Sequence, residues 1–380
     1  MIGQKGIPAR LGGVEAHVAA LATRLVHAGH NVTAYARSWY GDKQMKRYNG
    51  VDLKFVPTLH VKYVDTLVHS FLATLHTCFM VRPDVIHYHG ASASLFALMA
   101  RVLRPQVVVI ATLHDVNLHM DRGFIARHML GFAEKFGVKA SQATIAVSKA
   151  LRNYASLNYE TQVHYIPNGI EPVRMPVNST ILRGFGLQPF QYVLFSAQLT
   201  PHKGAHNLIK AWKKAYVEKP EFFAGKKLVI EGASVASATY TKQLRSQASG
   251  DDSIVLLGSQ AGDTRKALFA GSSFIAHPSV SEKLPTALLE AMSYGKAVIA
   301  ADIEENMEVL TPCGLPFLAN DINDLKKKLV VLMKDPMQAA SLGHGARAFV
   351  EQNYHWDDIA KETAMVYQEH VALRDGVLVI

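Results

Sequence analysis

Two glutamates eight positions apart give the strongest chemical signal in the sequence. Glu282 lies just before Pro285, and Glu290 lies in the helical pattern that follows it. Proline is favoured at the first position of a helix, so Glu282 is predicted in a loop and Glu290 more than one turn along a helix. The free N–H groups at such a helix start can hold phosphate oxygens, and a helical carboxylate can accept hydrogen bonds from ribose hydroxyls. An isolated pair of this kind is more typical of a capping carboxylate and a solvated helix residue.

A lysine and a glycine pair supply further groups that suit a phosphorylated ligand. Lys203 follows an apolar run and precedes a helical pattern, where its charge could neutralise a departing diphosphate. Gly12 and Gly13 precede an amphipathic pattern, and glycines at that point let the backbone approach a ligand closely. Lys-Gly turns and glycine-rich loops are common, so neither motif identifies a site by itself.

Four histidines lie close together in the sequence, namely His87, His89, His114 and His119. They follow different predicted strands or lie in loops, and their spacing is unlike that of zinc enzymes. We therefore expect no metal site and interpret His114 as a polar residue of a ligand-binding cleft. The sequence also lacks an Asp-x-Asp motif of the kind that holds a metal-bound diphosphate, so metal-independent chemistry is expected.

Short β-rich runs alternate with helical patterns along the whole chain. This alternation predicts an α/β protein with two doubly wound, Rossmann-like parallel sheets. Ligands bind at the carboxyl ends of the strands in such sheets, so the two domains are expected to face a cleft that contains the motifs above. The predicted strands are 31–37, 52–58, 84–89, 107–114, 143–148 and 163–167 in the first group, and 192–197, 227–231, 253–257, 273–277, 297–301 and 315–318 in the second.

A turn with two following prolines separates the two groups of strands. Asn168-Gly169 is a typical turn pair, and Pro172 and Pro176 follow it. We predict an N-terminal domain at 1–170 and a C-terminal domain at 171–353. Residues 354–380 include apolar side chains at helical spacing, and we expect them to form a helix that packs back on the N-terminal domain.

The composition is that of a globular protein with two hydrophobic cores. The 380 residues are 49% hydrophobic and 19% charged, which excludes a disordered chain. The longest apolar stretch, 71–81, is shorter than the roughly 20 residues of a membrane-spanning helix. The N-terminus lacks the apolar core of a signal peptide, and two cysteines are too few for a disulfide framework. A cytoplasmic protein without a transmembrane segment is expected.

Positive charge is concentrated in the N-terminal half. Residues 1–170 contain 18 Lys and Arg against 9 Asp and Glu, and this excess accounts for the net charge of +9. The basic residues are scattered and have no aromatic ladder among them, so nucleic acid is not expected as a partner. Peripheral binding to an anionic membrane, on the inner face of the cell membrane, and an ordinary solvated surface both remain open.

Taken together, the motifs resemble the retaining glycosyltransferases of family 4, which have the GT-B fold. The resemblance spans nearly the whole chain. The segments 6–9 and 294–295 are most similar to bacterial rhamnosyl- and related transferases of polysaccharide assembly. The other segments that carry the resemblance are 12–18, 29–33, 84–87, 112–115, 166–169, 202–204 and 282–292.

The resemblance implies that residues 1–170 form the acceptor-side domain and residues 171–353 the donor-binding domain, and it implies a role for each motif. Lys203 would contact the diphosphate of a nucleotide-sugar donor, and Glu290 would contact its ribose. His114 would lie near the donor sugar, and the loop of Gly12 and Gly13 would approach the diphosphate. The transferred sugar would be held by Glu282 and the backbone that follows it. The implied catalytic residues are His114, Lys203 and Glu282, and the remaining implied donor-binding residues are Gly12, Gly13, Gln198, Lys283, Leu284, Pro285 and Glu290.

The resemblance also implies the reaction. A hexosyl group would pass from a UDP-, GDP- or dTDP-sugar to a saccharide or lipid-linked acceptor in the synthesis of cell-surface polysaccharide, with no further cofactor. The acceptor would attack from the face that the diphosphate leaves, and the departing phosphate would help to take its proton. The protein would then stabilise the charge on the diphosphate and exclude water.

The sequence departs from the family pattern at a few positions. Gln198 stands where the family usually has an arginine, and a neutral amide cannot neutralise a phosphate oxygen. Lys283 stands where a glycine is common, and its charge is a candidate replacement for that arginine. The opening strand that the family places before the first glycine loop is reduced to Met1 and Ile2, so a truncated first strand is expected.

Two other functions fit the same features. A non-catalytic homologue could bind a nucleotide sugar without transferring it, and Gln198 favours that alternative. Nucleotide-sugar epimerases use a related two-domain fold, although their acid-base residues are not recognisable in this sequence. Nucleotide release that depends on an acceptor distinguishes transfer from both alternatives.

Overall fold

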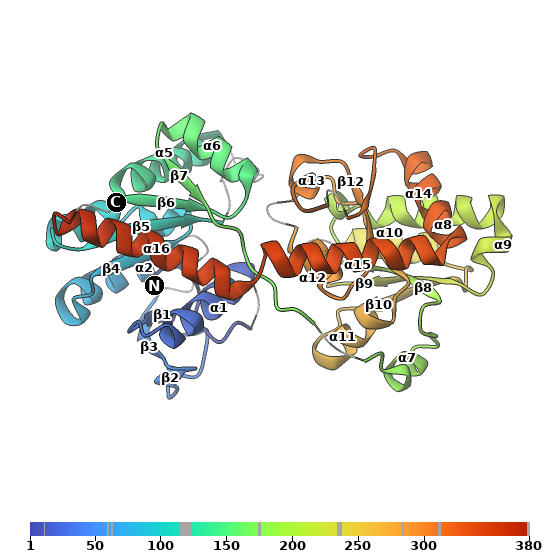
Figure 1. Cartoon of the computed structure of the whole chain (residues 1–380), viewed down its shortest axis with the longest axis horizontal. Helices are drawn as coiled ribbons and strands as arrows, with labels where there is room; N and C mark the ends of the chain where they lie inside the picture. Colours follow the sequence, from blue (N-terminus) through green and yellow to red (C-terminus); the bar gives the residue numbers. More distant parts are fainter. Residues whose placement is uncertain are drawn as a thin grey trace. The chain divides into compact units, whose positions relative to one another are not determined.

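The computed structural model describes residues 1–10, 12–58, 61, 64–114, 124–173, 176–233, 238–282, 285–310 and 313–377. The chain forms two compact units, which Figure 1 shows in the colours of the sequence. The first unit comprises Met1–Gly169 together with Trp356–Ile380, and the second comprises Ile170–His355. The C-terminal helix α16 (Trp356–Arg374) therefore belongs to the first unit.

The first unit contains two groups of strands. Strands β4, β5, β6 and β7 form a parallel sheet in that order, and β1, β3 and β2 form a second sheet in which only β2 is antiparallel. The bounds are β1 Thr33–Arg37, β2 Arg47–Tyr48, β3 Val51–Val56, β4 Val85–His89, β5 Val108–Leu113, β6 Ala143–Ala146 and β7 Val163–Tyr165.

Met1 and Ile2 connect these two groups of strands. The Met1 carbonyl accepts a hydrogen bond from the Tyr35 amide of β1 at 3.1 Å. Ile2 donates its amide to the His87 carbonyl at 3.0 Å and accepts from the His89 amide of β4 at 2.8 Å. These residues occupy the place of the strand that the family resemblance implies, and Ile2 forms a single parallel bridge with β4.

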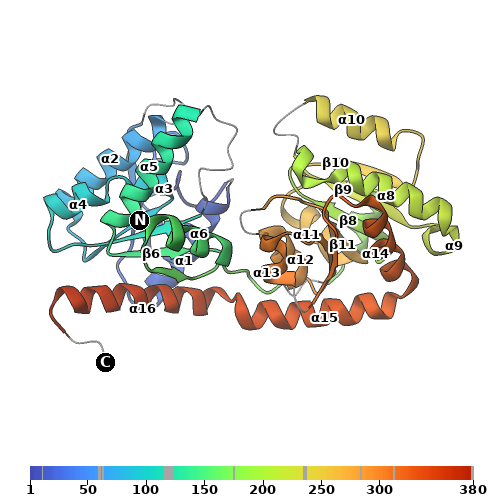
Figure 2. The same cartoon turned by 90° about the horizontal axis from the view of Figure 1, so that it is seen from above.

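Helices cover both faces of the sheet in the first unit. Helix α16 packs against α1 and β5, whereas α2, α4 and α5 lie on the opposite side (Figure 2). The bounds are α1 Gly13–His27, α2 Val64–His76, the π-helical turn η1 Thr77–Val81, α3 Ala91–Ser94, α4 Ala97–Leu103, α5 Phe124–Ala140 and α6 Lys149–Tyr159.

The second unit contains one six-stranded, fully parallel sheet in the order β10-β9-β8-β11-β12-β13. Its strands are fully buried in the middle, where Val193 and Phe195 have no exposed surface. The bounds are β8 Tyr192–Ser196, β9 Lys227–Glu231, β10 Ile254–Gly258, β11 Phe274–His277, β12 Ala297–Ala301 and β13 Leu315–Phe317.

Two hydrophobic clusters cover the two faces of this sheet. Trp212 of α8 lies in one cluster and Met292 of α12 in the other, and neither side chain is exposed. The bounds are α7 Ser179–Gly184, the 3₁₀ turn η3 Pro201–Lys203, α8 Ala205–Glu218, α9 Pro220–Phe223, α10 Ala238–Ala248, α11 Gly262–Gly271, α12 Thr286–Ser293, α13 Glu304–Leu310, α14 Ile322–Lys334 and α15 Pro336–Asn353.

Two details differ from the sequence predictions. Helix α12 begins at Thr286, so Pro285 is its N-cap residue and not its first helical residue. The apolar stretch at α2 and η1 is also longer than expected, because the continuous helical segment Val64–Val81 has 18 residues and a mean hydropathy of 1.3. By length and composition alone it meets the criteria for a membrane span, and 39% of it is buried within the first unit.

Candidate functional site

Glu282 of the second unit holds two basic side chains at the carboxyl edge of the sheet. Its Oε1 atom accepts hydrogen bonds from Lys203 Nζ at 2.5 Å and from His277 Nε2 at 2.6 Å. His277 is the last residue of β11, and Lys203 ends the turn that follows β8. β8 and β11 are neighbouring strands, so the parallel sheet brings residues that are far apart in sequence to one edge.

The loop that carries Lys203 is fixed by a glycine. Gly204 has a φ of +76°, and a Cβ atom there would lie 2.3 Å from the Pro278 carbonyl oxygen. Only glycine can adopt this conformation without strain at so close an approach. The Val280 amide also donates to the His202 carbonyl at 3.0 Å, so the Lys203 loop and the Glu282 loop are held together.

Glu282 is ionised in this environment. Burial alone would raise the pKa of its carboxyl group, but the hydrogen bond and charge of His277, together with Lys203, lower the pKa to about 2. An ionised carboxylate can only accept hydrogen bonds, so His277 carries a proton on Nε2. Lys203 still has two further N–H donors that Glu282 does not use, which is the chemistry required to hold an anionic ligand.

Glu290 is paired with an arginine that the sequence analysis did not single out. Arg265 of α11 binds both oxygens of the Glu290 carboxylate through Nη1 and Nη2, and the Nη2–Oε2 distance is 2.8 Å. Burial lowers the pKa of the Arg265 guanidinium, but Glu290 and Glu231 outweigh this effect and raise it. The arginine is permanently charged and fixes the orientation of Glu290.

A second buried carboxylate extends this network. Glu231, the last residue of β9, accepts hydrogen bonds from Ser196 Oγ at 2.5 Å and from the Gln260 amide at 3.0 Å. Its Oε2 atom lies 3.8 Å from Arg265 Nε. The carboxyl ends of β8 and β9 and the helices α11 and α12 therefore share one polar network, in which Arg265 lies between two carboxylates.

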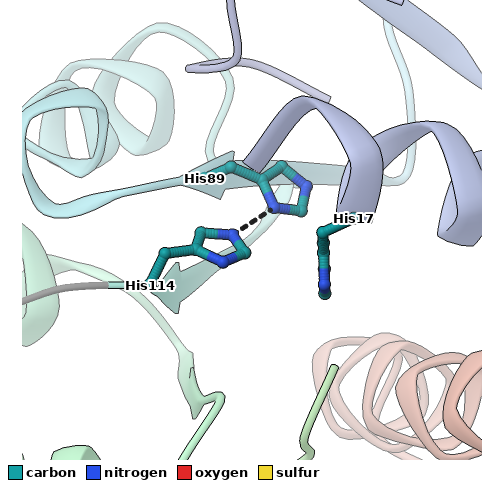
Figure 3. Close-up of side chains that lie close together, drawn as sticks. All are labelled: His17, His89 and His114. Atoms are coloured by element: carbon teal, nitrogen blue, oxygen red, sulfur yellow. Dashed lines mark hydrogen bonds between the residues drawn. The ribbon is translucent and has the colours of Figure 1, made fainter. Parts of the chain in front are cut away.

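Three histidines converge at the carboxyl edge of the sheet in the first unit (Figure 3). His89 ends β4, His114 follows β5, and His17 projects from α1. His89 Nδ1 and His114 Nε2 share a hydrogen bond of 3.2 Å, and His17 Nδ1 is 2.7 Å from Asn168 Oδ1. The ring of His17 meets both other rings edge-on or nearly so, at 5.4 Å from His89 and 4.7 Å from His114.

The three histidines are neutral. Burial lowers the pKa of His17 to about 4, although the Asn168 hydrogen bond partly opposes the effect. Burial, with a contribution from neighbouring histidines, lowers the pKa of His89 and of His114 well below the usual value. The amide oxygen of Asn168 can only accept a hydrogen bond, so His17 carries its proton on Nδ1 and its Nε2 atom is an acceptor. That Nε2 atom and His89 Nε2 are buried without a hydrogen-bond partner.

These histidines are also the one group in the described part of the chain whose geometry suits a metal ion. One nitrogen of each lies within 4.8 Å of the others. The set differs from the four histidines that were weighed, and rejected as a metal site, in the sequence analysis, because it includes His17 and leaves out His87, which uses both ring nitrogens in 2.6 Å hydrogen bonds to Tyr367 and Thr112. His119 lies outside the described residues.

The structure places the predicted residues in two groups. Lys203, Glu282 and Glu290 lie in the second unit, where Lys203 and Glu282 are in direct contact. Gln198 lies in the same unit, exposed just beyond β8. His114 belongs to the first unit. Lys283 and Leu284 lie outside the described residues, so the hypothesis that Lys283 replaces the missing arginine stays a prediction.

The glycine pair of the first unit forms the start of α1. Gly12 is the N-cap residue with a φ of +107°, and a Cβ atom there would lie 2.0 Å from Glu15 Oε2. No atom lies within 4 Å of the corresponding position at Gly13. The backbone of Gly12 therefore requires glycine, whereas the space at Gly13 is open.

Sequence reasoning missed His277, Arg265 and Glu231. His277 and Glu231 each end a predicted strand, and a titratable residue at that position is a usable signal, because ligands bind at the carboxyl ends of parallel strands. The sequence contains a weaker signal for Arg265. It lies 25 residues before Glu290 on a short helix, and only the three-dimensional arrangement brings the two together.

Two Rossmann-like units with polar groups at the carboxyl edges of their parallel sheets match the GT-B architecture that the sequence resemblance implies. Two family models match the chain, one described as "Glycosyltransferase Family 4" at residues 11–174 and the other as "Glycosyl transferases group 1" at residues 186–356. The protein belongs to glycosyltransferase family 4, as the sequence resemblance predicted.

Individual relatives agree with this assignment. The chain is 26% identical over 371 residues to the phosphatidylinositol N-acetylglucosaminyltransferase gpi3 subunit of Schizosaccharomyces pombe, a match that covers 94% of this chain and 77% of the relative. The fold is similar to that of sucrose-phosphate synthase from Thermosynechococcus elongatus, with a TM-score of 0.80, 19% identity, and coverage of 95% and 94% of the two chains. It is also similar to Anabaena Alr3699/HepE in complex with UDP and glucose, with a TM-score of 0.76, 18% identity, and coverage of 94% and 96%.

Proposed function

We propose that this glycosyltransferase moves a hexosyl group, with retention of configuration, from a nucleotide sugar to a saccharide or lipid-linked acceptor. The observation that carries the proposal is the arrangement of Lys203, Glu282 and Glu290 at the carboxyl edge of one parallel sheet. A cation, a buried carboxylate and a helical carboxylate there match the three parts of a nucleotide sugar, which are the diphosphate, the sugar and the ribose. The complex of HepE with UDP and glucose supports the same ligand class.

Each group has a distinct part in the proposed reaction. Lys203 binds the diphosphate and stabilises the charge that develops as the sugar leaves. Glu290, held by Arg265, accepts hydrogen bonds from the ribose hydroxyls, and Glu282 orients the transferred sugar. His114 contributes from the first unit as a neutral hydrogen-bonding group near the donor sugar. The leaving phosphate helps to take the acceptor proton, so no carboxylate nucleophile and no metal ion are required.

The proposed setting is cytoplasmic, on the inner face of the cell membrane, in the synthesis of cell-surface polysaccharide. A lipid-linked acceptor is supported by the gpi3 relative, whose name states a phosphatidylinositol acceptor. The nucleotide of the donor is not assigned among UDP, GDP and dTDP. The transferred sugar is left open among rhamnose, glucose, mannose and N-acetylhexosamine.

A donor screen tests the proposal. Thermal stabilisation by UDP-, GDP- and dTDP-sugars is measured for the wild type, for Glu290→Ala and for Glu304→Ala, which removes an exposed glutamate from α13 of the same unit. One donor is expected to stabilise the wild type and Glu304→Ala but not Glu290→Ala. Nucleotide release is expected only with acceptor present, and EDTA is expected to leave the rate unchanged.

Two results would count against transfer. Donor binding without nucleotide release for any saccharide or lipid-linked acceptor would favour the non-catalytic alternative. Release of free nucleotide without acceptor, or conversion of the donor to an isomeric nucleotide sugar, would favour hydrolysis or epimerisation. Loss of activity on metal removal would contradict the metal-independent mechanism.

A further inference from the structure

Helix α2 of the first unit exposes apolar side chains and buries polar ones. A helix on the surface of a globular protein normally turns its apolar stripe to the core and its polar residues to water. In α2 the side chains of Val64, Leu67 and Phe71, at helical spacing, are exposed. The buried positions of the same helix are polar or small, and they are Asp65, His69, Ser70, Ala73 and Thr74.

The exposed apolar stripe continues onto neighbouring elements. Phe79 and Met80 of η1 are 51% and 72% exposed, and α4 exposes three further aliphatic side chains. The ring of Phe71 lies 5.9 Å from that of Phe96, which is the residue before α4. We call this surface the outer apolar face, and its members are Val64, Leu67, Phe71, Phe79, Met80, Leu98, Val102 and Leu103.

Arginines border the outer apolar face, and the two carboxylates within residues 64–104 each lie near an arginine. Arg82, Arg101 and Arg104 flank it, and Arg104 donates to the Arg82 carbonyl at 3.0 Å. Residues 64–104 contain two acidic residues in sequence. Asp65 is buried in a 2.5 Å ion pair with Arg37, whereas Asp84 has an 82% exposed side chain and lies 3.7 Å from Arg374.

A face of this composition suits one kind of partner. Apolar side chains rimmed by arginines match the boundary between the acyl chains and the anionic headgroups of a bilayer. A symmetric dimer would bring the same arginines of two copies against each other, which costs energy through like-charge repulsion. A spanning segment would expose the paired Asp65 to lipid, although Val64–Val81 is long enough to span.

We propose that the outer apolar face docks this protein on an anionic membrane surface, with its apolar side chains in the interface and Arg82, Arg101 and Arg104 at the level of the lipid phosphates. The proposal deepens the proposed function, since it places the first unit where a lipid-linked acceptor is found. It does not depend on that function, because membrane binding is measured without turnover.

Flotation with lipid vesicles tests the proposal. The full chain is mixed either with vesicles of phosphatidylcholine alone or with vesicles that also contain roughly 30% phosphatidylglycerol. The phosphatidylglycerol supplies the negative surface charge of an anionic membrane. We expect the protein to float with the anionic vesicles and to be released as salt rises. The double variant Phe79→Glu, Met80→Glu is expected to lower the bound fraction at least tenfold. Both residues are exposed, so the fold is expected to tolerate the change.

Matched controls separate the outer apolar face from apolar exposure in general. Val217→Glu and Leu157→Glu each change a side chain that is 80% exposed elsewhere in the molecule, on α8 and on α6, and both are expected to bind vesicles as the wild type does. Arg82→Gln with Arg101→Gln is expected to remove the preference for anionic vesicles. Nucleotide release with a soluble saccharide acceptor is expected to be the same in Phe79→Glu, Met80→Glu as in the wild type, so a failure of transfer chemistry is recognised separately.

Three outcomes would overturn the proposal. The first is equal flotation of the wild type and the double glutamate variant. The second is equal binding to neutral and anionic vesicles, which would remove the role of the arginines. The third is a wild-type dimer in light scattering that the double variant converts to a monomer, with no vesicle binding by either, which would assign the face to a second copy of the chain.

Discussion

In the second unit, basic side chains from distant segments hold the two carboxylates of the proposed donor site. Glu282 is held by Lys203 and His277, and Glu290 is held by Arg265. A side chain that must bind a flexible ligand loses less entropy when its own position is already fixed. The basic side chains therefore determine how firmly the carboxylates are oriented before a donor binds.

Arg265→Met is expected to raise the donor KM on the order of tenfold, which corresponds to about 1.4 kcal/mol of lost binding, with a smaller change in kcat. The ribose is held in the same way in the ground state and in the transition state. A poorly oriented Glu290 therefore weakens the binding of both states equally. Initial-rate kinetics measure the split. The control is Lys266→Met, which changes the next residue and an ion pair with Asp263 at the surface. A lower KM would instead show that Arg265 competes with the ribose.

His89 is expected to act as a positioning residue for His114. Asparagine can place an amide close to the position of His89 Nδ1, so His89→Asn should keep the hydrogen bond to His114 Nε2, whereas His89→Leu removes it. We expect His89→Asn to retain most of the activity and His89→Leu to lose at least about tenfold in kcat, with little change in KM. Nitrogen NMR of His114 reports its tautomer independently of turnover. An unchanged His114 spectrum in His89→Leu would contradict this role, and His27→Leu on the exposed end of α1 is the control.

At the scale of elements, glycines at strand and helix junctions fix the loops that carry the sites. Gly12, the N-cap residue of α1, has a backbone conformation that other residues adopt only with strain, and the carboxylate of Glu15 fills the space beside it. Glu15 Oε1 in turn accepts a hydrogen bond from the Lys5 amide at 3.0 Å. The start of α1 is thereby tied to the loop that precedes it.

Gly12→Ala is expected to lower the free energy of unfolding by about 1–3 kcal/mol, which is the usual range for a non-glycine residue held in a rarely populated conformation. The adjacent Gly13→Ala is expected to be neutral or slightly stabilising, since that position is open and within the helix. Urea denaturation followed by circular dichroism compares the two. Equal stability of both variants would show that the loop adjusts freely.

Much of the fold follows from the pattern of residues along the chain. Each predicted strand is present, because β-rich runs between helical patterns report buried parallel strands directly. The two-residue strand β2 was missed, since Arg47–Tyr48 is too short and too exposed to produce a pattern. Two partners of the site carboxylates, His277 beside Glu282 and Arg265 beside Glu290, were also missed. The strand end at His277 was a usable signal that was not used, whereas the pairing of Arg265 with Glu290 depends on how α11 and α12 lie in the fold, and sequence spacing does not contain that information.

At the scale of the whole molecule, the buried neutral histidines make the first unit the acid-sensitive part. His17, His69, His87, His89 and His114 all have pKa values that are lowered chiefly through burial, and all belong to this unit, whereas the second unit has two less buried histidines with lowered pKa values, His202 and His206. Above pH 6.5 these side chains are neutral in both the folded and the unfolded chain. As the pH falls from 6.5 to about 4, the unfolded chain takes up protons that the folded unit does not, so folding is destabilised.

The first unit is therefore expected to unfold before the second between pH 6.5 and 4. Each unit of pKa lowering costs about 1.4 kcal/mol once the pH is below the folded pKa. The tryptophans report the two units separately, because Trp39 and Trp356 lie in the first unit and Trp212 in the second. The fluorescence of the Trp212→Phe variant reports the unfolding of the first unit. The fluorescence of the double variant Trp39→Phe with Trp356→Phe reports the unfolding of the second. Coincident transitions of the two variants in this range would contradict the prediction.

The second unit is a single uninterrupted stretch of chain, whereas the first is assembled from both ends of the sequence. The two ends of that stretch lie side by side, since Ile170 and His355 form a parallel bridge and the Ile170 amide donates to the Tyr354 carbonyl at 2.8 Å. A stretch whose ends meet can be replaced as a cassette without moving its neighbours. Residues 170–355 could thus be grafted from one family member to another. Under the proposed function, in which Lys203, Glu282 and Glu290 of this stretch bind the donor, such a graft is expected to change the nucleotide sugar that is used.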